Sequence, residues 1–241
     1  HLGLPDAGIA TYTDMVGRVA QIARITQTAL IADGDTGYGG LLNVQHTVRG
    51  YESAGACGIQ LEDQDFPKKC GHMLGRRVIS SADMAAKIRV AVDSRSSRDF
   101  LIVARTDART TLGLDEALRR ADLYLKAGAD VLFVESPESI EEMRRIGERF
   151  RGVPLLANMV EGGRTPLLSK AELEHIGYRI AIFPALGFLA AGAALDKVYA
   201  GLKRDGSSTD VSVPLYDFKR FSELMGFELV AEFDRKYADA P

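Results

Sequence analysis

The chain has 241 residues and a net charge of −3, from 30 lysines and arginines against 33 aspartates and glutamates. This length fits one large α/β domain, and the mixed charges leave no basic surface for nucleic acid. No apolar stretch approaches the roughly 20 residues that cross a bilayer, and two free cysteines fit a reducing compartment. We therefore expect a cytoplasmic globular protein with neither nucleic-acid nor membrane partners.

Apolar, β-branched-rich runs alternate along the chain with amphipathic stretches, which is typical of βα units with a parallel sheet. After a loop over 1–10, the first helix is predicted over Asp14–Ile25, with Thr13 as its N-cap. A later helix begins at a capping box formed by Ser139 and Glu142. The runs that we interpret as strands are Ala29–Ala32, Gly58–Leu61, Phe100–Ala104, Val131–Val134, Pro154–Ala157 and Arg179–Phe183.

Most of these runs are followed by polar or charged side chains. The side chains are Asp33, Asp35, Glu62, Arg105, Asp107, Glu135, Asn158 and Glu161. A (β/α)8 barrel builds its active site at the carboxyl ends of successive strands, whereas a doubly wound sheet gathers such residues at one point. The pattern therefore favours an α/β fold of the TIM-type (β/α)8 class. Because six strands are two too few, we expect two further βα units upstream of His1. The alternative, an open sheet, leaves its edges unprotected.

The chain divides into two regions of different composition. Residues 1–184 contain the βα pattern and are expected to form the barrel domain, without its first two units. The region 185–241 begins with an Ala/Leu/Gly-rich helix over Ala185–Leu202 and continues with a second helical pattern over Tyr216–Arg235. This tail is longer than closing a barrel needs, so we interpret it as a helical segment for oligomerisation.

Two carboxylates, Asp33 and Asp35, follow one predicted strand and are flanked by glycines, while Glu62 and Asp63 follow its neighbour. Carboxylate oxygens are the usual ligands of hard divalent cations, and the ends of parallel strands meet at one edge. The alternative is that aspartates here cap helices or form turns. We favour the metal for Asp33 and Asp35, and we leave open which of Glu62 and Asp63 forms a structural salt bridge instead.

A thiol in a basic setting follows the second predicted strand. Cys70 lies within the sequence Lys-Lys-Cys-Gly-His at 68–72. Nearby positive charge favours the thiolate, so this cysteine can give or take a proton near neutral pH. An inert loop thiol is the alternative, but the setting is too polar for it. Cys57, by contrast, follows small residues at a strand start and is predicted to be a small buried residue.

Residues Asp65–Val78 make a long polar loop around this thiol, with two glycines as hinges. The proposed proton donor, Cys70, lies beyond the strand end rather than on it. We therefore expect the loop to close over a substrate and to exclude water. Two histidines, His46 and His175, fall within helical patterns away from the strand ends and are expected on the surface.

Several segments in register resemble one enzyme family. They are Asp33–Gly39 (DGDTGYG), Leu61–Gln64 (LEDQ), Lys68–His72 (KKCGH), Ala104–Ala108 (ARTDA), Leu156–Met159 (LANM) and Glu161–Gly163 (EGG). Together they resemble the isocitrate lyase/phosphoenolpyruvate mutase superfamily, over about Leu2 to Lys203. The resemblance implies a (β/α)8 barrel that binds Mg²⁺, with Mn²⁺ as an alternative. It also implies a homotetramer, a dimer of dimers that exchange a C-terminal helix.

The Lys-x-Cys-Gly-His loop is similar to that of the superfamily's carbon–carbon lyases, which act on isocitrate, 2-methylisocitrate or 2,3-dimethylmalate. Met73–Arg77 (MLGRR) and Phe133–Pro137 (FVESP) look closer to the dimethylmalate and alkylmalate lyases than to typical methylisocitrate lyases. The resemblance thus implies an oxo-acid lyase that cleaves a substituted 2-hydroxy dicarboxylate or tricarboxylate into an α-keto acid, such as pyruvate, and a carboxylate. The alternatives are a carboxyphosphonoenolpyruvate or phosphoenolpyruvate phosphonomutase-type isomerase, an oxaloacetate-cleaving enzyme, and a non-enzymatic barrel kept for assembly or ligand binding.

The resemblance also implies roles for the acidic residues and for the thiol. Asp35 is the expected direct metal ligand, and Asp33 and Glu62 are expected to hold the metal through water. Cys70 is the expected proton donor to the carbanion that bond cleavage leaves on the departing fragment. The family's first-strand Tyr-Asp pair and its Ser/Gly-rich loop are not part of this chain.

Basic residues of the loop are expected to support this chemistry. Lys68, Lys69 and His72 tune the pKa of the thiol and help to anchor a carboxylate of the substrate. Lys68 and His72 are therefore counted with the catalytic residues. Gly71 is expected to line the substrate beside His72.

Three strand-end residues complete the predicted site. Arg105 can grip a substrate carboxylate in two places, or form a buried salt bridge to Asp107 or Glu135, or do both. Glu135 is expected to assist proton transfer or to position the arginine. Asn158 is expected to donate a hydrogen bond to a substrate carboxylate, the alternative being a residue that serves a turn.

Overall fold

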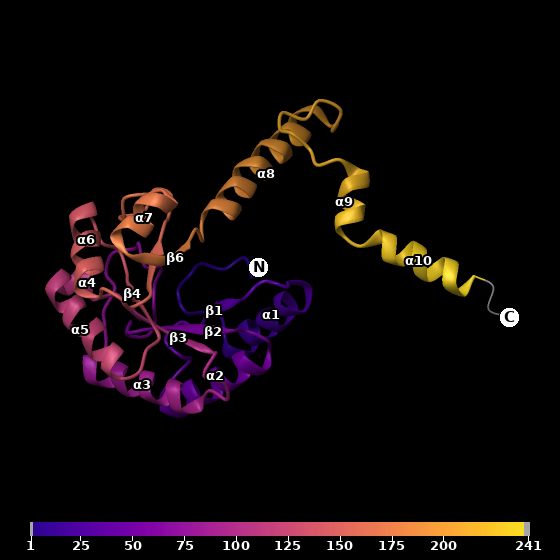
Figure 1. Cartoon of the computed structure of the whole chain (residues 1–241). Coiled ribbons are helices and arrows are strands. Elements are labelled where there is room, and N and C mark those ends of the chain that lie inside the picture. The colour runs from indigo at the N-terminus through magenta and orange to yellow at the C-terminus, as the bar shows by residue number, and fades with distance from the viewer. Residues whose placement is uncertain (1, 239–241) are drawn as a thin grey trace. The chain divides into compact units, whose positions relative to one another are not determined.

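The computed structural model describes residues 2–238. Within them, six strands form one sheet in which all neighbours are parallel and strand order follows chain order. The strands are β1 (Ile31–Asp33), β2 (Gly58–Glu62), β3 (Leu101–Thr106), β4 (Val131–Val134), β5 (Leu155–Asn158) and β6 (Tyr178–Ile182). The sheet curls into a half-barrel, with its strands on the inside (Figure 1).

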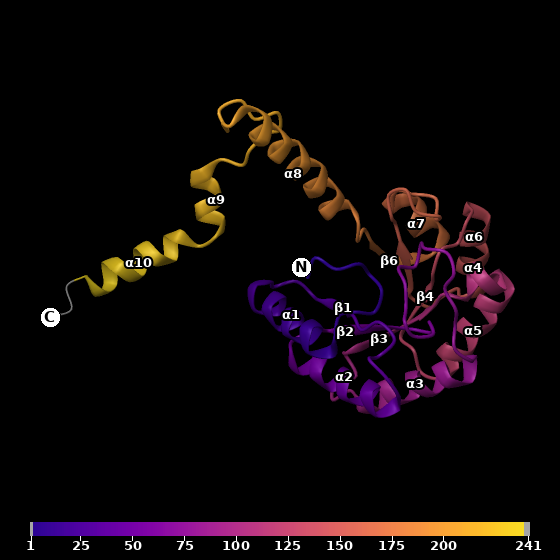
Figure 2. The same cartoon turned by 180° about the vertical axis from the view of Figure 1, so that it is seen from behind.

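Helices surround the strands on the outer side of the half-barrel, as two opposite views show (Figure 1 and Figure 2). They are α1 (Tyr12–Ile25), α2 (Leu41–Ser53), α3 (Ser81–Ser94), α4 (Ala108–Leu112), α5 (Leu114–Lys126), α6 (Ile140–Arg149) and α7 (Lys170–Ile176). Every connection between neighbouring strands contains a helix, which is how parallel strands are usually joined. The arrangement places all carboxyl ends of the strands at one edge.

Alternate residues of the strands pack in opposite directions. Side chains such as Ile59, Leu61 and Ile102 are fully buried in the larger core between sheet and helices. A smaller cluster on the other face contains Val103, Val131, Phe133 and Leu156. Each fully buried side chain of this kind contributes about 1.5–3 kcal/mol. The sheet is therefore held from both faces, and its polar strand ends have a rigid support.

The strand register brings polar strand ends to the same level. Glu62 and Arg105 are direct partners at the ends of β2 and β3. Asp33 pairs with Gln60 on β2, and Asn158 ends β5 opposite β6. The residues predicted for the site thus come from neighbouring strands.

All six predicted strands are confirmed, with ends that differ by at most two residues. The prediction of Thr13 as the first N-cap was wrong. The cap is Thr11, because Thr11 N donates to Asp14 Oδ2 at 2.9 Å while Asp14 N donates to Thr11 Oγ1 at 3.3 Å. The predicted helical pattern over Tyr216–Arg235 is two helices, because Gly226 adopts a left-handed backbone (φ 86°) between them.

The chain forms two compact units, which within the described residues are 2–185 and 186–238. The second unit contains α8 (Leu186–Asp205), α9 (Phe218–Leu224) and α10 (Phe227–Tyr237). None of these three helices buries a residue within the described chain. Among residues 2–238, no helix combines the length and apolarity that spanning a membrane requires.

Candidate active site

Three carboxylates from the ends of β1 and β2 face one another. Asp33, Asp35 and Glu62 each present an oxygen within 4.8 Å of the others. The turn after β1 needs Gly34, where a Cβ would lie 2.7 Å from the Ile59 side chain. It also places Asp35 in a left-handed conformation (φ 47°), and Asp33 Oδ1 accepts from Asp35 N at 2.9 Å. The tight turn thereby returns both aspartates to the side of Glu62.

Glu62 is buried without hydrogen-bond donors. It is 1% exposed, and neither of its carboxylate oxygens has a hydrogen-bond partner among the described residues. Burial raises the pKa of Glu62 well above its ordinary value. Arg105, whose Nη1 lies 3.3 Å from Glu62 Oε2, opposes this rise but does not cancel it. Buried polar atoms normally have partners, so these oxygens fit a cation held together with Asp33 and Asp35.

A lysine from the loop after β2 contacts the same carboxylates. Lys68 Nζ lies 2.5 Å from Asp35 Oδ1 and 2.5 Å from Asp6 Oδ1. Burial and the adjacent Asp33 raise the pKa of Asp35 to about 6, and Lys68 opposes this rise. Burial lowers the pKa of Lys68, but the carboxylates outweigh burial and raise it, so the ammonium stays charged. Lys68 therefore offsets part of the negative charge of the cluster.

Arg105 is shared among three carboxylates. Its Nε and Nη2 each donate to Asp107 at 2.9 Å, and its Nη2 lies 3.4 Å from Glu135 Oε2. The guanidinium also lies over the Phe133 ring, 5.1 Å from its centre. Burial raises the pKa of Asp107, but Arg105 and Arg76 outweigh burial and lower it below its ordinary value. The predicted salt bridge is thus present, and Asp107 holds the guanidinium in one orientation.

His72, Glu135 and Asn158 form a hydrogen-bonded group beside the arginine. His72 Nδ1 accepts from Arg164 N at 3.0 Å, so the proton of the ring lies on Nε2, which faces Glu135 Oε1 at 3.5 Å. Burial lowers the pKa of His72, which keeps the ring neutral. Asn158 Nδ2 donates to Glu135 Oε2 at 3.1 Å, and its Oδ1 is buried without a hydrogen-bond partner in the described chain.

The thiol loop is tied to the site on both sides of Cys70. At the base of the loop, the Gln64 amide donates to Lys69 O at 2.8 Å and accepts from Lys69 N at 3.0 Å. Further along, Gly71 packs so tightly that a Cβ would lie 2.5 Å from Arg105 Nη2. Gly71 O also accepts from Ser136 Oγ at 2.8 Å. The half-buried Cys70 therefore lies between two anchored residues, Lys69, which is bound to Gln64, and Gly71, which is bound to Ser136.

The structure brings most of the predicted site residues to this one edge. They are Asp33, Asp35, Glu62, Lys68, Gly71, His72, Arg105, Glu135 and Asn158, while Cys70 stands between Lys69 and Gly71 in the loop. Lys69 is the exception, because its side chain is exposed and its backbone is what contacts Gln64. Cys57 is half-buried, and its Sγ donates to Leu30 O at 3.3 Å.

Sequence reasoning missed three residues of the site. Asp6 contacts Lys68 from what we interpreted only as a loop, although an aspartate after Pro5 is a common turn signal. Arg76 donates to Asp107, and Ser136 holds the Gly71 carbonyl. No local pattern indicates these contacts, because each joins distant parts of the chain.

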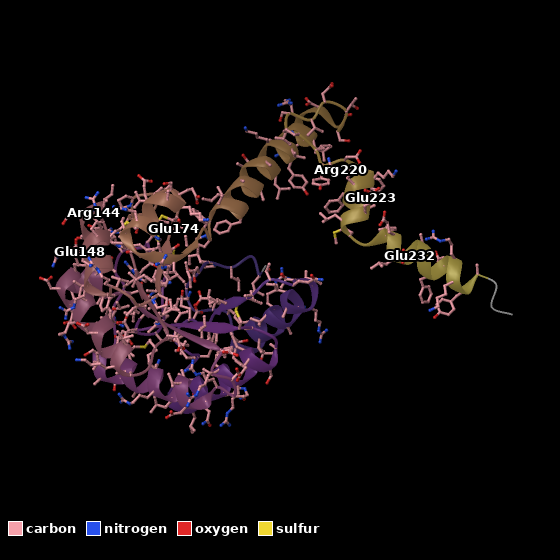
Figure 3. The ribbon with its side chains drawn as sticks, viewed as in Figure 1. Arg144, Glu148, Glu174, Arg220, Glu223 and Glu232 are labelled. Carbon is pink, nitrogen blue, oxygen red and sulfur yellow. The ribbon has the colours of Figure 1, made fainter. Side chains whose placement is uncertain are left out.

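A hollow of about 520 Å³ lies at the other end of the strands, beside the segments that lead into β5 and β6. Its lining includes Arg144, Glu148 and Glu174, which Figure 3 shows on the outside of α6 and α7. It contains no cysteine and none of the clustered carboxylates. The chemistry therefore concentrates at the carboxyl edge of the sheet.

Comparisons with known proteins identify the family of the chain. A sequence profile of the phosphoenolpyruvate phosphomutase family matches residues 1–203. The chain is 51% identical to the 2,3-dimethylmalate lyase of Eubacterium barkeri, over 99% of this chain and 82% of that protein. It is 43% identical to a 2-methylisocitrate lyase of Aeropyrum pernix, over 94% of this chain and 72% of that protein.

The fold matches in the same way. A crystal structure of 2,3-dimethylmalate lyase, described as a member of the PEP mutase/isocitrate lyase superfamily, superposes with a TM-score of 0.91. The match has 36% identity and covers 98% of this chain and 78% of that one. The chain therefore belongs to the phosphoenolpyruvate mutase/isocitrate lyase superfamily, as the sequence motifs predicted. The expected barrel class is confirmed to the extent of this parallel half-barrel.

Proposed function

We propose that the protein is a divalent-cation-dependent carbon–carbon lyase. Its substrate is a substituted 2-hydroxy dicarboxylate of the 2,3-dimethylmalate type, or a tricarboxylate of the 2-methylisocitrate type. The products are an α-keto acid, such as pyruvate, and a carboxylate. The similarity to proteins named for these two activities supports the substrate class.

The observation that carries the proposal is the buried carboxylate of Glu62, which has no hydrogen-bond donor among the described residues and lies beside Asp33 and Asp35. An anionic substrate would be repelled by such a cluster unless a cation lay between them. We assign Asp35 as the direct ligand, with Asp33 and Glu62 acting through water. When bound, Mg²⁺, or Mn²⁺ in its place, supplies Lewis-acid stabilisation of the oxygen anion that develops on the substrate.

The protein's own residues bind the substrate and move protons. Arg105 and the Nε2–H of His72 donate hydrogen bonds to a carboxylate of the substrate. Asn158 donates a further hydrogen bond to a substrate carboxylate. The substrate hydroxyl gives its proton to a general base and the C2–C3 bond breaks, so C2 becomes a carbonyl carbon and the electron pair of the broken bond stays on C3. Cys70 then gives its S–H proton to C3 and is left as a thiolate, which takes a proton from solvent before the next turnover.

The test is release of an α-keto acid from a panel of malate, 2,3-dimethylmalate, 2-methylisocitrate, isocitrate and oxaloacetate, with Mg²⁺, with Mn²⁺ and with EDTA. We expect turnover of an alkyl-substituted acid that EDTA abolishes. Cys70→Ser should lose activity by at least about a hundredfold, in line with loss of a general acid. Cys57→Ser is the matched control and should remain active. Turnover that is indifferent to Cys70, or absent for every acid, contradicts the proposal.

A phosphonomutase is the second candidate, because the matching family profile carries that description. It would interconvert phosphonate and phosphate esters of pyruvate on the same barrel. ³¹P NMR of the enzyme with phosphoenolpyruvate distinguishes the two. A phosphonate signal that survives Cys70→Ser favours the mutase, and its absence alongside acid cleavage favours the lyase.

We also propose a homotetramer, a dimer of dimers whose C-terminal helices are exchanged. The helices α8–α10 bury no residue in the described chain, and α8 exposes Phe188, Leu189 and Leu195. A hollow of about 290 Å³, whose lining mixes charged residues with apolar ones such as Leu173 and Phe183, lies over β6 and α7. Light scattering should report four copies, and Leu189→Glu with Leu195→Glu should reduce that number. We expect the protein in the cytoplasmic fraction of the cell.

A further inference from the structure

Four donors converge on the buried carboxylate of Asp63, the residue directly after Glu62. Oδ1 accepts from Asp107 N at 2.8 Å. Oδ2 accepts from Thr106 Oγ1 at 2.8 Å, from Tyr124 Oη at 2.7 Å and from Arg120 Nη1 at 3.0 Å. Asp63 is 0% exposed. Its oxygens are therefore used entirely by the protein, and a ligand has no access to them.

One branch of this network reaches the predicted carboxylate-binding arginine. Asp63 fixes the backbone N–H of Asp107, and the side chain of Asp107 holds Arg105 through two hydrogen bonds of 2.9 Å. The orientation of the guanidinium therefore depends on where Asp63 holds the end of β3. A small rotation of Asp107 would turn Arg105 away from the metal carboxylates.

A second branch reaches the base of the thiol loop. The backbone carbonyl of Asp63 accepts from Ile79 N at 2.9 Å, where the loop returns to the fold. Arg120 Nη1, which binds the Asp63 carboxylate, also donates to Ile79 O at 2.9 Å. Within the loop, Arg76 donates to Asp107. The same buried group thus holds both ends of the region that carries Cys70.

We propose that Asp63 is a positioning residue that sets the orientation of Arg105 relative to the Cys70 loop, with Tyr124 and Arg120 of α5 fixing its own orientation. The role in turnover rests on the function proposed above. A carboxylate is required because four donors need acceptor lone pairs on both oxygens. An asparagine at 63 would turn an NH₂ group toward some of these donors. The hydroxyl of Tyr124, by contrast, can be removed with little change of shape.

A double-mutant cycle in the full-length enzyme tests the positioning role. Asp63→Asn should lower kcat/KM for the accepted acid by about thirtyfold or more, and Tyr124→Phe by about threefold to tenfold, since small displacements of a binding group reduce rates strongly. In an Arg105→Lys background both losses should shrink to less than about twofold, because the group being positioned is gone. Losses of equal size in both backgrounds would overturn the proposal. Tyr124→Phe carries the cycle alone if Asp63→Asn does not fold.

A destabilised control separates positioning from stability. Ile146, in α6, is 1% exposed, belongs to the large core and makes none of the contacts of this network. Ile146→Ala should lower the melting temperature, yet its kcat/KM well below that temperature should stay near wild type in both backgrounds. If Ile146→Ala reproduces the kinetic losses of Tyr124→Phe, Asp63 acts only through stability and the proposal fails.

Hydrogen exchange gives a readout that does not depend on turnover. Tyr124→Phe and Asp63→Asn should speed exchange of the Ile79 and Asp65 amides by about tenfold, with α6 unchanged. If the wild-type protein turns over none of the acids but this local change is seen, the proposed function fails while Asp63 still positions the loop. Unchanged exchange at those two amides, or a uniform rise everywhere, would overturn the positioning role itself.

Discussion

Replacing Gly71 by alanine should displace the thiol loop while leaving Cys70 itself unchanged. The added Cβ would lie 2.5 Å from Arg105 Nη2 and 2.7 Å from Glu135 Cδ. Ordinary contact begins at about 3.5 Å, so the atoms must part by about 1 Å. Asp107 holds Arg105 through two hydrogen bonds, and Glu135 is fully buried, so neither can retreat. The loop must move instead.

A displacement of about 1 Å at a reacting group costs about a hundredfold in rate, or about 2.7 kcal/mol of activation free energy. We therefore expect Gly71→Ala to lower kcat/KM for the accepted acid by about that factor. The melting temperature should change little, because the loop moves and the buried strands of the sheet keep their packing. Steady-state kinetics and thermal denaturation measure both quantities.

Gly75, in the same loop, provides the control. Its backbone is left-handed (φ 77°), but a Cβ there would meet only the end of the Lys69 side chain, at 3.4 Å. Gly75→Ala should thus cost about 1 kcal/mol of local strain without pushing the loop off the site. Activity of Gly71→Ala within threefold of wild type, or an equal loss in both variants, would refute the steric reasoning.

Three further outcomes follow from the charges of the site and of its support. Asp6→Asn removes one of the two carboxylates on Lys68 and should lower kcat/KM about tenfold, measured beside the exposed-loop control Asp65→Asn. Because the pKa of Asp35 is raised to about 6, its carboxylate binds protons as the pH falls through 6, so calorimetry should show weaker Mg²⁺ binding at pH 5 than at pH 8. Arg119 and Arg120 depress the pKa of Glu116 to about 2. Urea unfolding of Glu116→Gln should therefore show a loss of up to about 1 kcal/mol at pH 7, which fades as the pH falls below the unfolded value of 4.5 towards 2.

The alternation of apolar runs with amphipathic stretches predicts the strands and helices well, because each segment must bury its own apolar side chains. The run Val131–Val134 is buried along its whole length and was placed without error. The first helix shows that the sequence pattern predicts the exact end of a helix less well than its existence. Thr13 lies next to the predicted helix, but Thr11 is the N-cap. Asp14 lies three residues after Thr11, so the two residues can exchange the reciprocal hydrogen bonds of a capping box.

Part of the site could be predicted, because the carboxyl ends of parallel strands lie at one edge of the sheet whatever the conformation of the loops. The meeting of Asp33 and Asp35 with an acidic residue at the end of β2 follows from that rule, but the choice of Glu62 over Asp63 does not. Contacts that depend on the path of a loop do not follow from it. The pair of Lys68 with Asp6 spans 62 positions, and its formation depends on the tertiary fold.

Two neighbouring acids show what only the tertiary environment decides. Glu62 and Asp63 are chemically alike and both are buried, and the sequence left open which one is structural. Strand alternation directs them to opposite sides. Asp63 meets Arg120 and three other donors, which complete its hydrogen bonding. Glu62 lies beside two further carboxylates and pairs with Arg105, which Asp107 and Glu135 share, so its oxygens fit an added cation. The proposed metal ligand and its supporting neighbour thus differ by one step along the backbone.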